Sequence, residues 1–308
     1  MKHDKIFGHL AVAGAYTIFG LNIVFCKDIA NAGAVPPMLL FTMRAVGASV
    51  LFWLISLFLP KEPVARGDIG LIALASFVGL FVPQLTFLKA ITISTSIDTS
   101  VMATLSPIFT MFFALIFQKE PITWKKALGV AVSFGGILLL IFNSVRSAGA
   151  VTRTEPLGFV LLFLNSVSFA LYLGAFRKVI SRYSVVTFMK WTFLFSLLLS
   201  LPFSARQIAT TDFSAIPANV IWEIGYLIFF ATFVAYFLIP YGQQRIRPTL
   251  VSMYTYLQPI IAVIISIASG LDVISWQKGL AILLVFSGVF LVIRSRAAVQ
   301  PASESIRK

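Results

Sequence analysis

Residues 105–142 read LSPIFTMFFALIFQKEPITWKKALGVAVSFGGILLLIF, which is two apolar segments joined by a short polar link. A related stretch, LQPIIAVIISIASGLDVISWQKGLAILLVFSGVFLVIR, occupies residues 257–294, 152 positions later. The two align without a gap, and the matched pairs include Pro107/Pro259, Trp124/Trp276, Lys126/Lys278 and Gly136/Gly288. Because proline, tryptophan, lysine and glycine coincide in one register, we infer an internal duplication, the signature of a repeated architecture.

The composition is that of an integral membrane protein. Of the 308 residues, 59% are hydrophobic and 11% are charged, and the mean hydropathy is +0.95, whereas soluble proteins carry about 25% charged residues. The single cysteine, Cys26, excludes an intramolecular disulfide framework and a cysteine metal cluster. In a membrane protein, the net charge of +13 indicates basic cytoplasmic loops rather than a nucleic-acid partner.

Ten apolar stretches have the length needed to span a bilayer, which takes about 20 residues. They cover approximately residues 7–26, 37–59, 69–89, 97–117, 124–142, 157–177, 185–203, 219–239, 249–269 and 276–294. Lys and Arg are concentrated in the loops that lie inside when both termini are placed in the cytoplasm. The positive-inside rule therefore predicts cytoplasmic termini.

Each half of the chain holds five predicted spans. Because five is odd, the second copy enters the bilayer from the opposite face, so the repeat is inverted. We expect an all-α integral membrane protein with ten transmembrane helices in two inverted five-helix repeats, residues 1–148 and 149–296, and a disordered cytoplasmic tail at 297–308. Inverted repeats are typical of alternating-access transporters, because exchanging the conformations of equivalent halves opens one central site to either side.

The repeated unit combines an apolar helix that opens on proline, an acidic residue in the link and glycine in the closing helix. These motifs are Pro107, Glu120, Gly129 and Gly136, repeated as Pro259, Asp272 and Gly288. With them, residues 7–294 resemble the EamA-type transporters of the drug/metabolite transporter superfamily. Two departures are Asp272, where Glu is more usual, and Ala281, where Gly129 predicts glycine.

This resemblance implies a multi-pass permease of the bacterial inner membrane for small metabolites, often an exporter of amino acids or related carboxylate-bearing compounds. It also implies a central cavity between spans 1, 3, 4, 6, 8 and 9, with spans 5 and 10 at the periphery.

Arg44 is the most informative charged residue. It lies seven residues after Pro37, which places it roughly 10 Å along a helix within the second predicted span. A charge at that depth is costly unless it faces a wet cavity or a partner, so it marks a candidate functional site. The guanidinium suits a bidentate pair with a substrate carboxylate; the alternative is a structural ion pair or snorkelling to the interface. Asp98 and Glu223 are the candidate partners, for an ion pair or for coupling.

Uncharged polar side chains within the spans form a second set of candidates. The set comprises Asn22, Gln84, Ser106, Asn165, Ser168, Tyr172, Tyr254 and Gln258. Asn165, Ser168 and Tyr172 are spaced i, i+3 and i+7, on one helical face. Because amides facing lipid would be left unpaired, these residues are expected to face inward. There they form either hydrogen bonds between helices or the wall of a central polar cavity.

Two pairs of motif residues are predicted to shape the helices: the prolines as kinks or bends, and the acids as stabilisers of helix starts. Pro107 and Pro259 lie within predicted spans, where a missing backbone donor kinks a helix, either passively or as a bend around a site. Glu120 and Asp272 each precede a helix start, with Thr123 or Ser275 as N-cap. An acid there satisfies free N–H groups and the positive helix end, which predicts a structural role.

The predicted function is secondary transport of small metabolites, with amino-acid export favoured; a permease or exchanger for another metabolite or drug-like class is the alternative. The first span lacks the carboxylate on which the superfamily's four-helix cationic-drug antiporters rely. An intramembrane enzyme acting on lipid-linked substrates is a remote alternative, because His3 and His9 lie at the N-terminal edge and no HExxH or Gly-x-Ser-x-Gly occurs. No cofactor or metal is expected. The expected partners are a small-molecule substrate and the lipid bilayer, and a monomer is compatible with the sequence.

Overall fold

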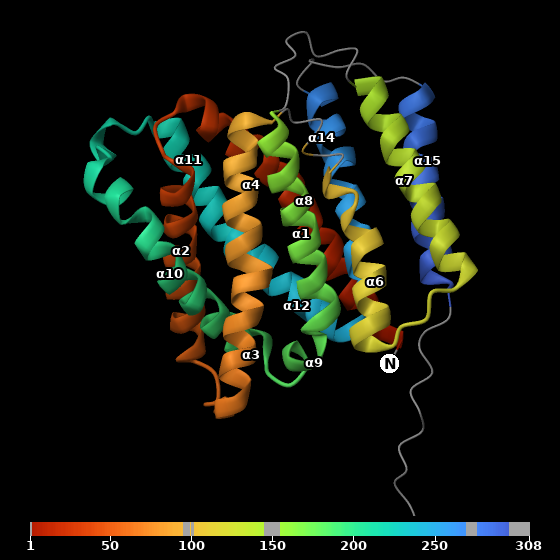
Figure 1. Ribbon diagram of the computed structural model, residues 1–308, viewed down its shortest axis with the longest axis horizontal. Coiled ribbons are helices and arrows are strands. Elements are labelled where there is room, and N and C mark those ends of the chain that lie inside the picture. The colour runs from red at the N-terminus through yellow and green to blue at the C-terminus, as the bar shows by residue number, and fades with distance from the viewer. Residues whose placement is uncertain (1, 95–98, 100–101, 145–154, 269–275, 296–308) are drawn as a thin grey trace, which may run out of the picture.

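The computed structural model describes residues 2–94, 99, 102–144, 155–268 and 276–295, and within these ranges it contains helices and connections but no strand (Figure 1). The elements are α1 (Lys2–Ala32), α2 (Pro37–Ser56), α3 (Arg66–Ser76), η1 (Phe77–Phe81), α4 (Val82–Ile93), α6 (Ser106–Gln118), α7 (Trp124–Ser144), α8 (Pro156–Ala175), α9 (Arg177–Ile180), α10 (Val185–Thr210), η2 (Phe213–Ala215), α11 (Ala218–Tyr226), η3 (Leu227–Val234), α12 (Ala235–Arg245), α13 (Pro248–Met253), η4 (Tyr254–Tyr256), α14 (Leu257–Ala268) and α15 (Trp276–Ile293). The predicted tail at 297–308 lies outside the described residues.

Six helical runs in the described ranges are long and apolar enough to cross a membrane. They are His3–Ala32, Pro37–Ser56, Arg66–Ile93, Pro156–Ala175, Val185–Thr210 and Ala218–Arg245. Two further apolar helices, Ser106–Gln118 and Gly279–Ile293, are shorter. The expectation of an all-helical multi-pass membrane protein is confirmed, since helices satisfy backbone polar groups within the chain, as lipid requires. The count of ten spans stays a prediction.

Large apolar side chains cover much of the outer surface. Phe58, Leu10 and Leu283 are 87%, 62% and 62% exposed. In water, an apolar surface of this extent would drive association, whereas in a bilayer it is the surface that lipid tails contact. The interior is a second apolar environment, in which residues such as Val12, Phe188 and Met253 are fully buried.

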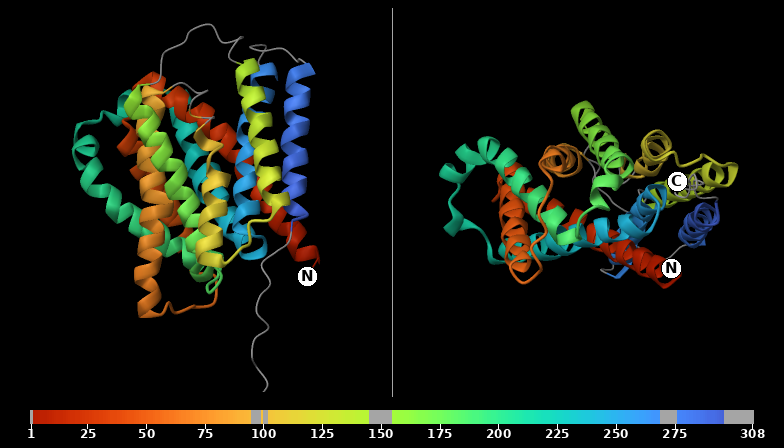
Figure 2. Two further views of the ribbon diagram at one scale, coloured as in Figure 1. Left: turned by 45° about the vertical axis from the view of Figure 1, so that its right-hand side comes forward. Right: turned by 90° about the horizontal axis from the view of Figure 1, so that it is seen from below.

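The helices pack in two corresponding sets. Helix α1 packs against α12 and α14, and α8 packs against α4 and α6. Helices α2 and α10 contact each other; α2 also contacts η3, and α10 also contacts η1. The α7–α15 pair stands at one end of the elongated molecule, opposite α2, α10 and α11 (Figures 1 and 2). This is the peripheral position that the family resemblance implied for spans 5 and 10.

Helices α7 and α15 approach closely through glycine. A Cβ at Gly136 would lie 2.8 Å from the carbonyl oxygen of Ala281, and one at Gly129 would lie 2.6 Å from that of Gly288. Between them, Ser133 Oγ donates a hydrogen bond to the carbonyl of Val285 at 3.0 Å. A Cβ at Gly135 would meet nothing within 4 Å. Gly129, Gly136 and Gly288 thus allow the contact, as small residues do between membrane helices, but Gly135 does not contribute.

Two helices are interrupted immediately before a proline. Pro107 lies in the first turn of α6 rather than in mid-helix, and the chain before it makes a tight turn in which Leu105 N donates to Met102 O at 3.2 Å. Pro259 is the third residue of α14 and follows the 3₁₀ turn η4. A proline ring clashes with the carbonyl four residues earlier. This steric conflict accounts for the opened turns.

Candidate functional site

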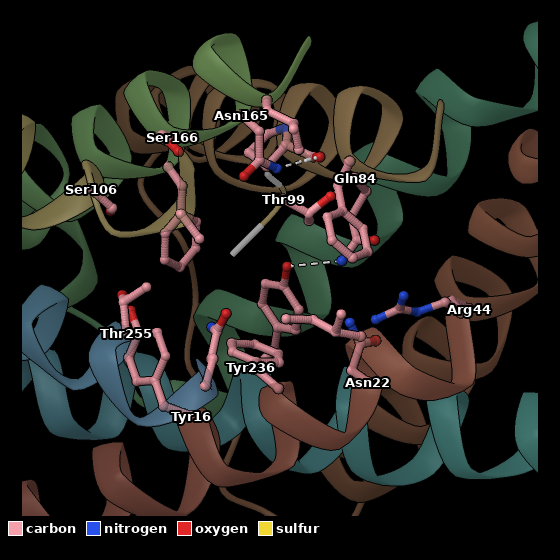
Figure 3. Close-up of a pocket in the computed structure, with 18 residues that line it drawn as sticks. Tyr16, Asn22, Arg44, Gln84, Thr99, Ser106, Asn165, Ser166, Tyr236 and Thr255 are labelled. Carbon is pink, nitrogen blue, oxygen red and sulfur yellow. Dashed lines mark hydrogen bonds between the residues drawn. The ribbon is translucent and has the colours of Figure 1, made fainter. Parts of the chain in front are cut away.

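A cavity of about 100 Å³ lies at the centre of the bundle, between α1, α2, α4, α6, α8, α12 and the η4–α14 break (Figure 3). Six of the predicted site residues contribute to its lining: Asn22, Arg44, Gln84, Ser106, Asn165 and Gln258. They come from six helices that are distant in sequence. The interrupted turns bring the chain before Pro107 and Pro259 to the same wall, through Ala103 and Thr255.

Two amides on the cavity wall, those of Asn165 and Gln84, are held in place by hydrogen bonds that they donate. Asn165 Nδ2 donates to the carbonyl of Pro83 at 2.7 Å, and Gln84 Nε2 donates to the hydroxyl of Tyr236 at 3.0 Å. Within the described structure, the buried Oε1 of Gln84 and Oγ of Ser106 have no hydrogen-bond partner. Buried polar atoms are normally paired. These two atoms are therefore available to a bound solute.

Arg44 is 1% exposed and is the one charged residue among the described lining residues. Its Nε donates to Thr232 Oγ1 at 2.8 Å, and its Nη1 lies 3.9 Å from Cys26 Sγ. Its Nη2 has no partner in the part of the chain that the structure describes. In Figure 3 the guanidinium points from α2 toward the cavity. A buried cation with a free donor is costly, and an anionic group in the cavity would lower that cost.

The predicted carboxylate partners of Arg44 have different outcomes. Asp98 lies outside the described residues. Glu223 forms no ion pair with Arg44 in the described structure; its Oε2 is buried and has no hydrogen-bond partner there. An ion pair between Arg44 and Glu223 is therefore absent from this conformation.

Three predicted cavity residues lie elsewhere. Ser168 Oγ donates to the carbonyl of Val78 in η1 at 2.6 Å, and the ring of Tyr172 is buried against Gly79. Tyr254 shares a hydrogen bond of 2.8 Å with His9 Nδ1. On α8, the neighbouring residues Ser166 and Phe169 line the cavity instead. Ser168 therefore makes a hydrogen bond between helices, which was the alternative to a place on the cavity wall. Ser168 and Tyr172 do not line the cavity with Asn165, because η1 covers the edge of α8 that carries them.

The sequence-based reasoning missed several lining residues. These are Tyr16, Phe19, Phe87, Thr99, Ser166, Phe169, Tyr236 and Thr255. The repeat held a signal for one of them, because Tyr236 lies 152 positions after the predicted residue Gln84. Ser106 and Gln258, which were both predicted, have the same separation. A polar residue in one half of the chain thus predicts a lining residue 152 positions away in the other half.

Glu120 has a structural position, but its partners differ from the expected helix-start N–H groups. Its carboxylate lies 2.9 Å from Lys126 Nζ and 3.8 Å from Arg247 Nη1, and it accepts a hydrogen bond from Thr249 Oγ1 at 3.1 Å. It thereby joins α7 to α13 and to the connection that precedes α13. Thr123 Oγ1 accepts from Lys126 N at 3.3 Å, which confirms the predicted N-cap. Asp272 lies outside the described residues.

The interrupted helices, the buried polar cavity and the apolar outer surface define a multi-pass membrane protein with a small polar cavity at its centre. The profile of the EamA-like transporter family matches residues 6–142 and 156–294. The chain therefore belongs to the EamA-like transporter family, and it is a membrane transporter of small solutes.

Individual relatives agree with this assignment. The uncharacterized transporter YetK of Bacillus subtilis is 21% identical over 302 residues, which cover 96% of this chain and 90% of the relative. The uncharacterized inner membrane transporter YedA of Escherichia coli is 25% identical over 268 residues, 83% of this chain and 81% of the relative. A solved crystal structure superposes with a TM-score of 0.74 at 15% identity over 94% of this chain and 96% of the other. That likeness shows the fold alone.

Proposed function

We propose that the protein is a secondary transporter that works by alternating access and exports small carboxylate-bearing metabolites such as amino acids. In this proposal ten spans form two inverted repeats, residues 1–148 and 149–296, in the bacterial inner membrane with both termini in the cytoplasm. The observation that carries it is the make-up of the cavity wall. Gln84 and Tyr236, Ala103 and Thr255, and Ser106 and Gln258 are pairs separated by 152 residues, and every member lines the cavity.

Two hydrogen bonds support a two-fold relation between the halves. Gln84 bonds to Tyr236 and Ser133 bonds to Val285, and each bond joins positions 152 residues apart. Equivalent residues can touch only where they lie close to the axis that relates them. One of these contacts is in the cavity, so the proposed axis passes through the solute site.

The contact between α7 and α15 supports the same relation. The approach of Gly136 to Ala281 corresponds, after a shift of 152 positions, to the approach of Gly288 to Gly129. The packing of α1 on α12 and α14 likewise corresponds to that of α8 on α4 and α6. The family profile also matches two successive stretches of similar length. A site on such an axis can open to either side when the halves exchange conformations.

The chemistry of the wall supports a carboxylate-bearing substrate. Arg44 Nη2 has no partner among the described residues. The position 152 residues after Arg44 is Ser196, so only one half of the chain supplies this charge. A guanidinium binds a carboxylate through charge-assisted hydrogen bonds. Gln84 Oε1 and Ser106 Oγ can accept from an amino or hydroxyl group, and Phe19 and Phe169 provide apolar contact.

Ligand-dependent thermal stability of the purified protein tests this proposal. Amino acids should raise the unfolding temperature of the wild type, and their amides, which lack the carboxylate, should raise it much less. In Arg44→Gln the difference between acid and amide should disappear. Equal stabilisation by acids and amides, or none by either, would contradict a carboxylate-binding site.

A further inference from the structure

A second hollow, of about 1060 Å³, is lined by residues from the start of α1 and from the ends of α6, α12 and α15. These helix ends lie at one face of the molecule, at the bottom of Figure 1. Its cationic lining residues are Lys5, Arg177, Lys178, Arg182, Arg245 and Arg247. Glu120 is the one carboxylate in the described part of this lining. Positive charges from three separate segments of the chain therefore line this hollow.

The neutralising contacts at this hollow are few. Glu120 is already shared between Lys126 at 2.9 Å and Arg247 at 3.8 Å, and Arg182 is paired with Asp68 at 2.7 Å. Four cations, Lys5, Arg177, Lys178 and Arg245, contact no carboxylate among the residues described here. Like charges brought together in this way repel one another. A bound anion would relieve that repulsion.

Topology alone does not account for this arrangement. The positive-inside rule needs basic residues only in cytoplasmic loops, whereas Arg177, Arg245 and Arg247 are half-buried between helices. Arg177 Nε donates to the carbonyl of Gln243 at 3.0 Å, and Arg245 packs 3.5 Å from the centre of the Tyr241 ring. Burial lowers the pKa of Arg177; Glu120 opposes that shift and Arg247 reinforces it. These arginines are fixed in position.

We propose that this hollow binds a phosphate group, and that the phosphate belongs to the headgroup of an anionic phospholipid. A phosphate accepts hydrogen bonds from several guanidinium and ammonium groups at once. Basic pockets between transmembrane helices at the cytoplasmic side suit acidic headgroups. Beside Lys5 on α1, Ile6, Phe7 and Leu10 are 50%, 56% and 62% exposed, so an apolar surface for acyl chains adjoins the cations. That continuity favours a lipid over a soluble phosphate.

The test is a binding titration of the delipidated full chain in detergent. Short-chain phosphatidylglycerol, phosphatidylcholine of the same chain length, inorganic phosphate and glycerol phosphate are added separately, and binding is read by native mass spectrometry and by unfolding temperature. Arg245→Gln and Lys5→Gln each remove one cation from the lining and keep a polar side chain at that position. Lys125→Gln is the matched control, because Lys125 is exposed at the start of α7 and does not line the hollow.

Phosphatidylglycerol should bind and stabilise the protein more than phosphatidylcholine does. Arg245→Gln and Lys5→Gln should each weaken that binding about fivefold, since one basic residue near an acidic lipid surface contributes about 1 kcal/mol; Lys125→Gln should bind as the wild type does. The lipid assignment would be overturned if inorganic phosphate or glycerol phosphate bound as tightly with the same dependence on the variants. Equal binding of the two phospholipids, or an equal loss in Lys125→Gln, would overturn the site itself.

Discussion

Gln84 and Tyr236 lie 152 positions apart in the sequence and meet at the centre of the bundle, where Gln84 Nε2 donates to the Tyr236 hydroxyl at 3.0 Å. Both side chains line the solute cavity. Gln84 follows Pro83 near the start of α4, and Tyr236 occupies the corresponding start of α12. The bond therefore connects the two halves of the chain at the proposed symmetry axis and leaves Gln84 Oε1 free for the solute.

Tyr236→Phe should lower the stability of the protein by about 1 kcal/mol, because it leaves the buried Nε2 of Gln84 without its acceptor. Solute binding should weaken as well, since the amide is then free to rotate. Thermal unfolding with and without solute measures both effects. Tyr172→Phe is the control: the Tyr172 hydroxyl is buried without a partner in the described structure, so its removal should leave both quantities unchanged. Equal losses in the two variants would contradict a specific role for the bond.

Gly136→Ala should destabilise the α7–α15 pair by about 1–3 kcal/mol, the usual cost of overpacking. The new Cβ would lie 2.8 Å from the Ala281 carbonyl, on a backbone that cannot move far. Gly135→Ala provides a control on the same helix, because its Cβ would meet nothing within 4 Å. The close approach is tested by comparing the unfolding temperatures of the two variants in the same detergent. A loss in Gly135→Ala as large as that in Gly136→Ala would contradict the close approach.

Glu120→Gln should lower stability by about 3 kcal/mol, because it leaves the buried Lys126 ammonium without its carboxylate. The side chains of Glu120 and Lys126 are 4% and 0% exposed, so water does not replace the lost partner. The double variant Glu120→Gln/Lys126→Met should recover part of the loss, since the unpaired charge is removed. A double-mutant cycle on unfolding free energy measures the coupling. Additive effects of the two substitutions would show that the pair contributes nothing.

Trp124 and Trp276 provide a test of the inverted topology. They are the first residues of α7 and α15, they are 79% and 74% exposed, and they occupy equivalent places in the proposed repeat. In a Cys26→Ser background, Trp124→Cys should react with a membrane-impermeant thiol reagent only from the cytoplasmic side. Trp276→Cys should react only from the outer side. Labelling of both from the same side would contradict inverted repeats.

Polar residues at depth in the predicted spans identified part of the cavity wall. Arg44, Gln84, Asn165 and Gln258 were predictable because a polar group at bilayer depth needs an inward environment. The rotation of each helix was harder to predict. Ser168 and Tyr172 have helical spacing with Asn165, but the packing of η1 over that side of α8 decides which of them reach the cavity.

The positions at which helices are interrupted could not be predicted from hydrophobic periodicity either. The prolines predicted bends, yet the opened turns fall before them, and the cavity wall there includes Ala103, an apolar residue with no signal of its own. Besides Lys126, Glu120 contacts Arg247 and Thr249, which are distant in sequence, so local helix-start rules could not predict these two partners. Such contacts depend on tertiary packing, which a single sequence does not specify position by position.

The most direct measurement is counterflow of labelled amino acids into proteoliposomes that contain the wild type, Arg44→Lys or Arg44→Gln. Each variant is first shown to be monodisperse and folded, because Arg44 also bonds to Thr232. The wild type should exchange at least one class of amino acid, Arg44→Lys should retain part of that exchange, and Arg44→Gln should lose it, since a single ammonium can replace the charge but not the bidentate geometry. Exchange of the same amino acid by Arg44→Gln at the wild-type rate would contradict the proposal that Arg44 binds the substrate carboxylate.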